Sequence, residues 1–371
     1  MNCIEYKFDE VVTLFDKQRV PLSSMERAKR QGKYPYYGAQ GIIDYIDDYI
    51  FDGEYLLLAE DGENLKSNKQ NLAQLVDGKF WVNNHAHILR TKEVCRLRYY
   101  YYWINSKNMA EYVTGSAQPK LSQASLKKMI IPLPSLGVQD KILGVVTPID
   151  DKIKENTRIN ENLLQQAGDV FNKFYEESPN RQPFTPLINV LGGGTPKTGN
   201  PDFWDGPIPF FTPKDVGAPY TFQTEKYITE SGLAHCNSHL YQKDTTFVTA
   251  RGTVGKVSLA GTPMAMNQSC YALVSETVDP LLVYFYVLKA VASLKHKASG
   301  AVFDAIVTRD FDSETINILS DDDSKKVLSI IKPMMDTIHN NSQENMRLAA
   351  LRDSLLPKLM SGELDVSSLD P

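Results

Sequence analysis

The sequence predicts an α+β protein in which two mixed, strand-rich domains are separated by two long antiparallel helices that form a coiled-coil-like spacer. At 371 residues the chain is longer than one compact domain and suits two domains with connecting structure. Two long stretches carry apolar residues at the 3-4 spacing of packed helices, and the other regions hold short β-rich runs between Gly and Asn turns. Because the two stretches also repeat each other, the fold class includes a pseudo-twofold internal repeat.

The two helical stripes repeat each other with a constant offset. Each position of the first stripe recurs 185 residues later, so that Val327 follows Ile142. The same offset relates two asparagines and the prolines Pro148 and Pro333. A repeat of this kind indicates a duplicated structural unit. The first stripe is Ile142, Val146, Ile149, Ile153, Asn156, Asn160, Leu163, Ala167, Val170 and Phe174, and the second is Val327, Ile331, Met334, Ile338, Asn341, Asn345, Leu348, Arg352, Leu355 and Leu359.

The regions before each stripe repeat more loosely and define four parts of the chain. Residues 34–37 resemble 208–211, residues 58–62 resemble 249–253, residues 81–84 resemble 265–268, and Gly115 falls 185 residues before Gly300. We therefore expect a first domain at 1–135, a central helix at 136–178, a second domain at 179–322 and a final helix with a tail at 323–371.

Within each domain the expected elements follow the same order. Strands are predicted at 55–58, 246–249 and 271–274, and a helical stretch is predicted at 98–113 and again at 280–297, before one more strand. Pro179, Pro183 and Pro186 mark the end of the first long helix. The second long helix should end at Ser361, because Gly362 is the usual residue just past a helix terminus.

The asparagines in the stripes suggest how the two long helices pair. Antiparallel pairing places Asn156 opposite Asn345 and Asn160 opposite Asn341. A buried Asn pair lowers stability but fixes register, because a slip leaves an amide without a partner. Parallel pairing would also align asparagines, but each domain would then have to thread back along the full rod. Antiparallel pairing is therefore favoured.

The two prolines lie inside the stripes. An interior proline costs about 3 kcal/mol and kinks a helix. We expect a kink at Pro148 and at Pro333; the alternative is that a new helix begins there, with Thr147 as its cap and Pro148 in its first turn.

Composition limits the classes of partner. No apolar run approaches the roughly 18 residues that span a bilayer, and no secretory signal is visible, so we expect a cytoplasmic protein without a membrane partner. The four cysteines lie far apart, which argues against a disulfide framework or zinc ribbon and favours small apolar side chains in or near cores. The net charge of −5 disfavours nucleic-acid binding unless basic residues cluster on one face.

Several motifs resemble the specificity subunits of type I restriction-modification enzymes. The segment IPLPSLGVQDKI at 131–142, followed by IDDKI at 149–153, resembles their central conserved region. The tail at 351–364 resembles their C-terminal conserved region. The second domain resembles the target-recognition domains of these subunits through GGTPK at 193–197, NPDFW at 200–204, TPKD at 212–215, ARGTVGK at 250–256 and MNQS at 266–269. The first domain resembles another member of the same domain family through YPYYGA at 34–39, GIIDY at 41–45, AEDG at 59–62 and GSAQPKL at 115–121.

The resemblance implies that each domain recognises one half of a bipartite, asymmetric target in double-stranded DNA. It implies that the helices set the spacing and dock two methyltransferase subunits, with two motor-nuclease subunits added for cleavage. This chain would be a non-catalytic recognition subunit without a cofactor, since S-adenosylmethionine would be bound by the methyltransferase and ATP by the motor. The first domain lacks the GGTPK opening, and GAVFD at 300–304 replaces the QPKL signature, so the two half-sites should differ.

A self-contained enzyme is disfavoured by the motifs that would have to serve it. NPDF at 200–203 resembles a methyltransferase motif, but an acid replaces its second proline and no Gly-rich cofactor loop follows a clear strand. In the run at 192–198, Pro196 occupies the place of a phosphate-loop glycine. His85 and His87 could be a metal pair, but no third ligand is suggested, and two hydrogen-bonded histidines are favoured. We therefore expect no metal and no catalytic residue.

DNA readout needs Arg, Lys, Asn or Gln at loop tips. Residues 99–103 are aromatic and could stack on bases, but at helical spacing they are expected in the core. The DNA-binding candidates are Gln40, Lys79, Asn83, Asn84 and His85 in the first domain, and Lys197, Thr198, Asn200, Lys214, Arg251, Lys256, Asn267 and Gln268 in the second.

The alternative function is a helical scaffold or interaction protein that carries two non-DNA binding modules. The expected rod, roughly 50–60 Å long, fits this function as well as DNA recognition.

Overall fold

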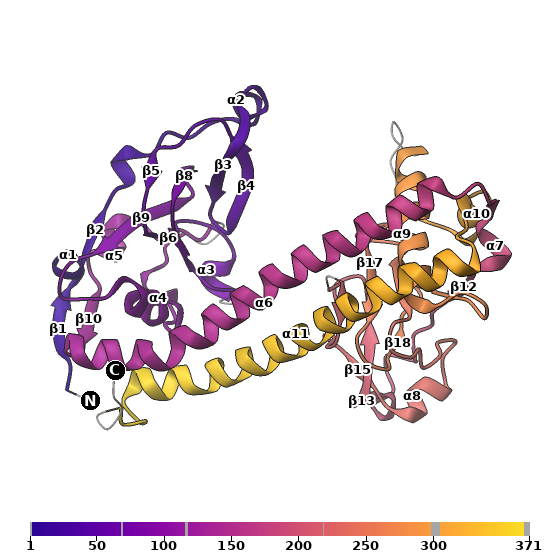
Figure 1. Cartoon of the computed structure of the whole chain (residues 1–371). Coiled ribbons are helices and arrows are strands. Elements are labelled where there is room, and N and C mark those ends of the chain that lie inside the picture. The colour runs from indigo at the N-terminus through magenta and orange to yellow at the C-terminus, as the bar shows by residue number, and fades with distance from the viewer. Residues whose placement is uncertain (1, 68–69, 116–117, 218, 298–304, 367–371) are drawn as a thin grey trace. The chain divides into compact units, whose positions relative to one another are not determined.

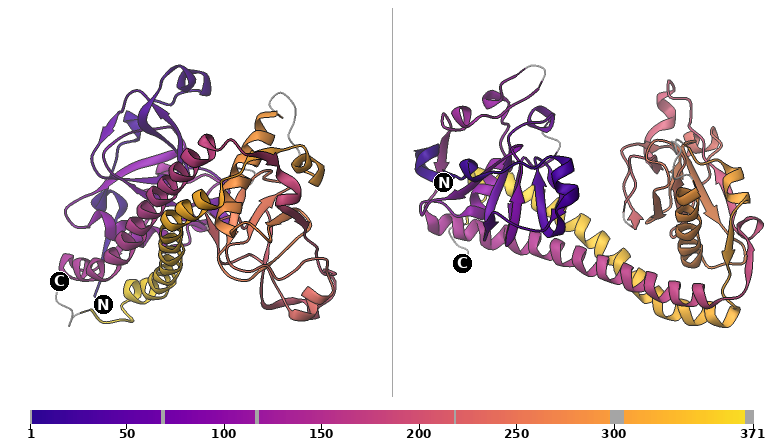
Figure 2. Two further views of the ribbon diagram at one scale, coloured as in Figure 1. Left: turned by 45° about the vertical axis from the view of Figure 1, so that its right-hand side comes forward. Right: turned by 90° about the horizontal axis from the view of Figure 1, so that it is seen from above.

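The computed structural model describes residues 2–67, 70–115, 118–217, 219–297 and 305–366. The sequence motif at 300–304 and part of that at 115–121 lie outside these residues. Contacts divide the chain into unit 1, which comprises residues 1–151 and 348–371, and unit 2, which comprises residues 152–347. Two long helices, α6 (Leu136–Glu177) and α11 (Asp321–Ser361), each contribute one part to unit 1 and the other part to unit 2 (Figures 1 and 2).

The described part of unit 1 contains three small sheets. One joins β1 and β10 in antiparallel register, a second has the antiparallel order β2-β9-β6-β7, and a third has the order β4-β3-β8-β5 with β3 and β8 parallel. The strands are β1 (Ile4–Lys7), β2 (Val12–Leu14), β3 (Gln31–Gly38), β4 (Gly41–Ile46), β5 (Phe51–Asp52), β6 (Tyr55–Ala59), β7 (Ala73–Val76), β8 (Lys79–Val82), β9 (Ala86–Thr91) and β10 (Ile130–Leu133).

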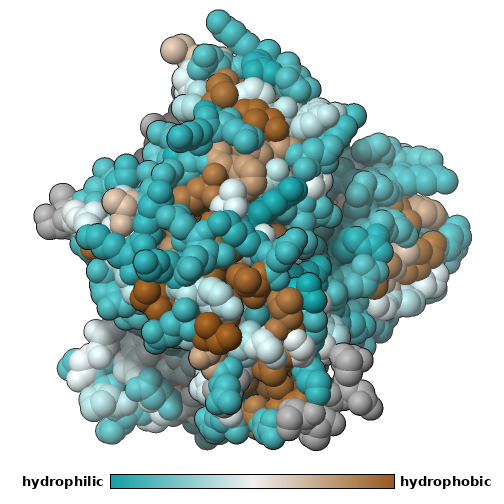
Figure 3. Space-filling model, turned by 90° about the vertical axis from the view of Figure 1, so that its left-hand side faces the viewer, coloured by the Kyte–Doolittle hydropathy of each residue, from teal (hydrophilic) through white to brown (hydrophobic). Residues whose placement is uncertain are grey.

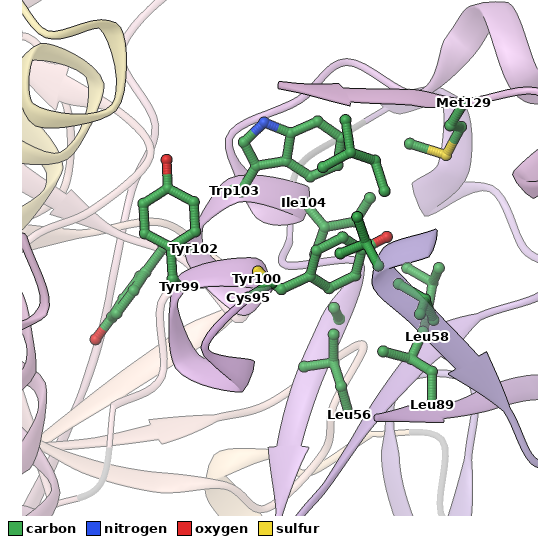
Figure 4. Close-up of a cluster of buried hydrophobic side chains, with 14 of the residues drawn as sticks. Leu56, Leu58, Leu89, Cys95, Tyr99, Tyr100, Tyr102, Trp103, Ile104 and Met129 are labelled. Atoms are coloured by element: carbon green, nitrogen blue, oxygen red, sulfur yellow. The ribbon is translucent and has the colours of Figure 1, made fainter. Parts of the chain in front are cut away.

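A helix rich in aromatic residues covers the second sheet of unit 1. Helix α4 (Leu97–Asn105) packs on β6, β7 and β9, and its Tyr100 and Trp103 rings stack with centroids 5.5 Å apart (Figure 4). Tyr99, Tyr100, Tyr102 and Trp103 are buried, so the prediction that this run enters the core is confirmed. The shorter helices are α1 (Phe8–Val11), η1 (Asp16–Gln18), α2 (Ser24–Lys29), α3 (Asn64–Ser67), η2 (Ala110–Tyr112) and α5 (Gln123–Leu126).

The predicted helix at 98–113 was too long. Helix α4 ends at Asn105, and a separate short helix, η2, begins at Ala110. Between them the Asn108 side chain accepts a hydrogen bond of 2.9 Å from the Ala110 backbone N–H. Asn commonly forms such local turns, which compete with helix continuation.

The described part of unit 2 also contains three sheets. One joins β11 and β20, a second has the order β12-β19-β16-β17-β14, and a third has the order β15-β13-β18 with β13 and β18 parallel. The strands are β11 (Arg181–Pro183), β12 (Asn189–Gly192), β13 (Trp204–Phe211), β14 (Tyr220–Thr221), β15 (Tyr227–Ile228), β16 (Thr246–Thr249), β17 (Val257–Ala260), β18 (Ala265–Met266), β19 (Cys270–Val274) and β20 (Thr315–Asn317).

Helix α9 (Pro280–Lys297) is the central helix of unit 2. It coincides with the predicted helix at 280–297, and its buried apolar residues pack against β16, β17, β19 and β20. All residues from Leu281 to Val287 are buried, so its first two turns are covered on every side, whereas Leu288 is partly exposed. The shorter helices are α7 (Phe184–Leu187), η3 (Pro201–Phe203), α8 (Glu230–Ala234) and α10 (Thr308–Asp312).

The two units repeat one strand arrangement. The order β2-β9-β6-β7 of unit 1 recurs as β12-β19-β16-β17 in unit 2, and the parallel pair β3–β8 recurs as β13–β18. The predicted likenesses of 34–37 with 208–211 and of 81–84 with 265–268 fall on these parallel strands. The internal repeat is thus present in the sheets as well as in the helices.

One predicted alignment between the domains was wrong by one residue. Matching 58–62 to 249–253 would place Glu60 on Arg251. In the structure the Glu60 N–H donates to the His85 carbonyl at 2.9 Å, and the Ala250 N–H donates to the Ser269 carbonyl at 2.8 Å. Glu60 is therefore equivalent to Ala250, because backbone hydrogen bonds and not side-chain similarity define the strand register.

The long helices contact each other within each unit. In unit 1, Ile142 and Val146 of α6 and Leu359 of α11 belong to one buried cluster. In unit 2, the Asn156 amide donates to Asn345 Oδ1 at 2.9 Å, and the Asn341 amide donates to Asn160 Oδ1 at 2.9 Å. These are the asparagine partners that antiparallel pairing requires.

The prolines do not start new helices. Pro148 lies inside α6 and Pro333 inside α11, and both helices are continuous through these positions. The alternative in which Thr147 caps a new helix is therefore wrong. Both prolines are exposed, so the carbonyl freed by each lies on a solvent-facing side of its helix. Helix α11 ends at Ser361, and Gly362 has φ +78°, as predicted for its C-terminus.

The cysteines fit the prediction only in part. Cys95 and Cys270 are buried, Cys236 is half-buried and Cys3 is exposed, so Cys3 is not a core residue. Figure 3 shows a face of the molecule on which hydrophobic side chains form several small groups among hydrophilic ones. Scattered exposed apolar residues of this kind are normal for folded proteins. None of the described helices combines the length and the apolar character needed to cross a membrane.

Candidate nucleic-acid interface

Four loops of unit 2 meet where β12, β13, β16 and β18 end. The Asn267 N–H, just after β18, donates to the Phe211 carbonyl at the end of β13 at 3.0 Å. The Thr253 hydroxyl, after β16, donates to the Pro213 carbonyl at 3.2 Å. We call residues 193–200, 212–215, 250–256 and 267–269 the unit 2 loop cluster. Parallel pairing of β13 and β18 accounts for it, because the carboxyl ends of parallel strands lie at the same edge.

The glycine-rich loop after β12 joins the cluster by close backbone approach. A Cβ at Gly193 would lie 2.2 Å from the Asn267 carbonyl oxygen, so no larger residue fits without displacing this backbone. The Thr195 hydroxyl donates a hydrogen bond to Gln268 Oε1. The GGTPK run therefore places Lys197 and Thr198, both exposed, on a loop that is anchored at Gln268.

The unit 2 loop cluster carries exposed basic side chains. Arg251 lies two residues after the end of β16 and precedes Gly252, whose φ of +80° lets the chain turn sharply. Lys256 is exposed, and Lys214 is exposed with its ammonium 3.6 Å from Glu225. Within the described residues Arg251 makes no ion pair. Its guanidinium is therefore available to a ligand.

Two amides of this cluster hold the backbone. Asn267 Oδ1 accepts from the Ser269 N–H at 3.0 Å, and Asn200 Oδ1 accepts from the Asp202 N–H at 3.2 Å. Each side chain thus fixes a turn through its oxygen. Both side chains therefore have a structural role through their oxygens, while their amide nitrogens can still donate.

Unit 1 has an equivalent cluster at the ends of β2, β3, β6 and β8. The Asn83 N–H donates to the Tyr37 carbonyl at 3.0 Å, as Asn267 does to Phe211 in unit 2. Asn83 Oδ1 accepts from the His85 N–H at 2.8 Å, as Asn267 Oδ1 does from Ser269. We call residues 15–19, 38–41, 60–62 and 83–85 the unit 1 loop cluster.

Four of the five unit 1 candidates lie in this cluster. Gln40 is exposed in the tight turn between β3 and β4, Asn84 is exposed, and Asn83 is buried with the structural bond just described. His85 is half exposed, and its Nδ1 lies 2.7 Å from Asp61 Oδ2.

Lys79 is not brought together with the other four. It begins β8, whereas Asn83 follows the end of that strand. Its ammonium lies 4.6 Å from the centre of the Tyr49 ring, and the hydrogen bond with Tyr49 raises the pKa of Lys79. Lys79 therefore belongs to the opposite end of the third sheet.

Beneath the unit 1 loop cluster lies a buried ionic network. His87 Nδ1 is 2.6 Å from Asp16 Oδ2, and His87 Nε2 is 2.7 Å from the Leu121 carbonyl oxygen. Each ring nitrogen of His87 therefore faces an oxygen acceptor, a carboxylate on one side and a carbonyl on the other. Arg19 Nη1 donates to Glu60 Oε2 at 2.7 Å and also to the Asn84 carbonyl at 3.3 Å, which ties the network to the loop.

The network stabilises its two carboxylates in the charged form. Burial raises the pKa of Asp16, but the hydrogen bond and charge of His87, together with hydrogen bonds from the Ile88 N–H and Gln123, outweigh it, and the pKa lies below its usual value. Burial likewise raises the pKa of Glu60, and the hydrogen bond from Arg19 and the charges of His87 and Arg19 bring it below its usual value.

Asp16, Glu60 and His87 have ligand atoms within 4.8 Å of one another, which is the kind of spacing that a metal site would require. Arg19 already lies 2.7 Å from Glu60 and 3.6 Å from Asp16, and the Lys120 ammonium lies 3.2 Å from Glu60. Both nitrogens of His87 already face acceptors. These contacts engage each of the three side chains in an ion-pair network formed by the chain's own residues. His85 and His87 are each hydrogen-bonded to an acid, as favoured from sequence.

Three residues of the loop clusters were missed by sequence reasoning. Asp61 contacts His85, Arg19 contacts the Asn84 carbonyl, and Thr195 contacts Gln268. Their partners lie 24, 65 and 73 residues away in sequence. Asp61 lies in the quoted AEDG motif and Thr195 in GGTPK, so the motifs contained a signal, whereas Arg19 lies in no motif.

The fold and the paired loop clusters define an internally duplicated α+β protein with one polar loop cluster per repeat. The sequence matches the family described as "Type I restriction modification DNA specificity domain" over residues 3–165 and 186–350. The chain therefore belongs to this family, and the resemblance inferred from the sequence is confirmed.

Individual relatives agree with this assignment. The chain is 37% identical over 144 residues to the "Putative type I restriction enzyme specificity subunit S.HindORF215P" of Haemophilus influenzae. This match covers 38% of this chain and 36% of that protein. It is 24% identical over 273 residues to the EcoR124I/EcoR124II specificity subunit of Escherichia coli, and this match covers 67% of this chain and 66% of that subunit. The match to the first relative thus spans little more than a third of its length.

A solved structure supports the fold. The crystal structure of the type I restriction-modification S subunit from M. genitalium aligns with a TM-score of 0.62 at 14% identity, and covers 97% of this chain and 96% of that one. The predicted fold class is confirmed by this likeness.

Proposed function

We propose that this chain is the sequence-specificity subunit of a type I restriction-modification enzyme, in which each unit contacts one half of a bipartite, asymmetric DNA target. The single observation that carries this proposal is the loop cluster that recurs at equivalent strand ends in both units. Each cluster presents exposed donors, Gln40, Asn84 and His85 in unit 1 and Lys197, Arg251 and Lys256 in unit 2. Family membership supports the same function.

The charge distribution removes one objection from composition. The net charge is −5, but exposed basic residues gather in the unit 2 loop cluster, whereas three successive acids, Asp321, Asp322 and Asp323, lie in the first turn of α11. Local basic patches bind phosphates even on acidic proteins, because exposed charges beyond about 10 Å are largely screened.

The chain acts in this proposal without catalysis of its own. The helices α6 and α11 set the spacing and dock two methyltransferase subunits, and two motor-nuclease subunits join for cleavage. S-adenosylmethionine then belongs to the methyltransferase and ATP to the motor. The ion-paired state of Asp16, Glu60 and His87 supports this division, since those side chains already engage one another and Arg19.

The test is to reconstitute the chain with its cognate methyltransferase subunit and to map methylated bases on DNA. The expected result is two short motifs at a fixed spacing. Exchanging residues 183–320 for those of a relative should change one motif only. Methylation without a bipartite motif would contradict the proposal, and catalysis by the purified chain alone would contradict its non-catalytic role.

A further inference from the structure

One backbone position carries opposite charges in the two units. The Leu121 N–H donates to the Glu60 carbonyl at 2.8 Å, and the Ile306 N–H donates to the Ala250 carbonyl at 2.9 Å. An isolated bridge then joins Asp61 to Lys120 in unit 1, and the corresponding bridge joins Arg251 to Ala305 in unit 2. The next residue in each unit, Gly62 or Gly252, has positive φ. Asp61 and Arg251 are therefore structurally equivalent.

The geometry points to this position as the determinant of base preference in both units. We infer that Arg251 reads a guanine in one half-site, and that Asp61, held by His85, reads the exocyclic amino group of a cytosine or adenine in the other half-site. The inference rests on the proposed function and adds to it the chemical identity of one base contact in each half of the target.

The surroundings of Arg251 and Asp61 leave both side chains able to contact a base. Arg251 is exposed and makes no ion pair within the part of the chain that the structure describes. The Asp61 carboxylate is one-fifth exposed, and one of its oxygens accepts from His85 at 2.7 Å. The nearby Lys120 ammonium lies 3.2 Å from Glu60, so its charge is directed to the buried network. Asp61 thus keeps acceptor capacity on its second oxygen.

The negative charge of Asp61 in unit 1 indicates whether this position contacts a phosphate or a base of the DNA. An arginine alone could bind either group. A carboxylate would be repelled by a phosphate, but it accepts hydrogen bonds from base amino groups in the major groove. If equivalent loops approach DNA in the same way, a position that accommodates Asp61 in one unit faces base edges in both. Arg251 would then donate to guanine O6 and N7.

The test uses the chain reconstituted with its cognate methyltransferase subunit, with methylated bases mapped on a library of randomised target sites. R251A should reduce discrimination at one base of one half-site by about tenfold to a hundredfold, and D61A should do so at one base of the other half-site. R251K should also relax that base, because lysine cannot make the bidentate contact. R181A removes an exposed arginine from β11, outside the loop cluster, and should leave both half-sites unchanged.

Folding is checked by the thiols of Cys95 in unit 1 and Cys270 in unit 2, which stay protected from alkylation while each unit is intact. A uniform loss of methylation in R251A or R251K, with an unchanged motif, would show a phosphate contact and overturn the inference. A relaxed base in R251A but none in D61A would overturn it as well, because the equivalence requires both. If the unaltered chain gives no bipartite motif, the proposed function itself has failed.

Discussion

Units 1 and 2 build the same strand framework over different interiors. At three equivalent positions unit 1 has Asp16, Glu60 and His87, all engaged in the buried network, where unit 2 has Gly192, Ala250 and Tyr271. The backbone hydrogen bonds after β6 and β16 are nevertheless the same. The comparison teaches that main-chain pairing positions these loops, while the layer beneath them is free to be ionic in one unit and uncharged in the other.

The energetic consequence differs between the units. A buried ion pair contributes little net stability compared with packed apolar residues, but removing one partner leaves a buried charge uncompensated. Unit 1 therefore depends on every member of its network. Unit 2 has no such dependence at the equivalent positions.

The largest expected effect comes from breaking this network. Asp16→Asn should lower the free energy of unfolding of unit 1 by about 3 kcal/mol, because the charge of His87 loses its partner. Alkylation of Cys95 should accelerate, while alkylation of Cys270 should not change, since the two thiols lie in different units. Asp52→Asn removes an exposed acid of unit 1 and serves as the control. Equal acceleration at both thiols would refute the independence of the units.

A fall in pH should destabilise unit 1 before unit 2, as the Asp16→Asn substitution does. The pKa values of Asp16 and Glu60 are lowered in the folded state, so their contribution is fully present above their unfolded values near 4 and is lost as the pH falls through the folded values. Hydrogen exchange between pH 6 and pH 3 should therefore show unit 1 losing protection before unit 2. Loss of protection in unit 2 first would contradict the assignment of this acid sensitivity to the network.

The helix contacts offer a smaller contrast. In unit 2 the contact includes the Asn160–Asn341 pair, whereas in unit 1 it includes the apolar residues Ile142, Val146 and Leu359. Asn160→Ala should cost about 2 kcal/mol, because the Asn341 amide loses its acceptor at this half-buried site. Chemical denaturation followed at Cys270 measures the effect. The double variant Asn160→Leu with Asn341→Leu should regain stability, and a further loss would show that the amides are not a matched pair.

The smallest expected effect concerns DNA. Lys256→Ala should weaken DNA binding about threefold, uniformly across sequences, and reduce the dependence of affinity on salt by about one ion. Titrations of the reconstituted complex at several salt concentrations provide the measurement. Lys79→Ala is the matched control, because Lys79 lies at the far end of β8. A change of motif in Lys256→Ala would assign this lysine to a base instead.

The repeat, the two long helices, the antiparallel asparagine partners and the family could be predicted from the sequence. These features depend on periodic spacing over many residues, which a single sequence displays directly. The end of α4 was misjudged because a local turn at Asn108 competes with a weak helical pattern. The one-residue error at Glu60 arose because similar side chains do not define strand register.

Other features were decided by tertiary structure alone. The pairing of His87 with Asp16, of Arg19 with Glu60 and the equivalence of Asp61 with Arg251 all join residues from separate strands. Periodicity determines which residues share a face of one element, and it carries no information on which loops meet when several strands end at one edge. That meeting depends on strand order and parallel pairing, which are fixed only when the whole sheet has formed.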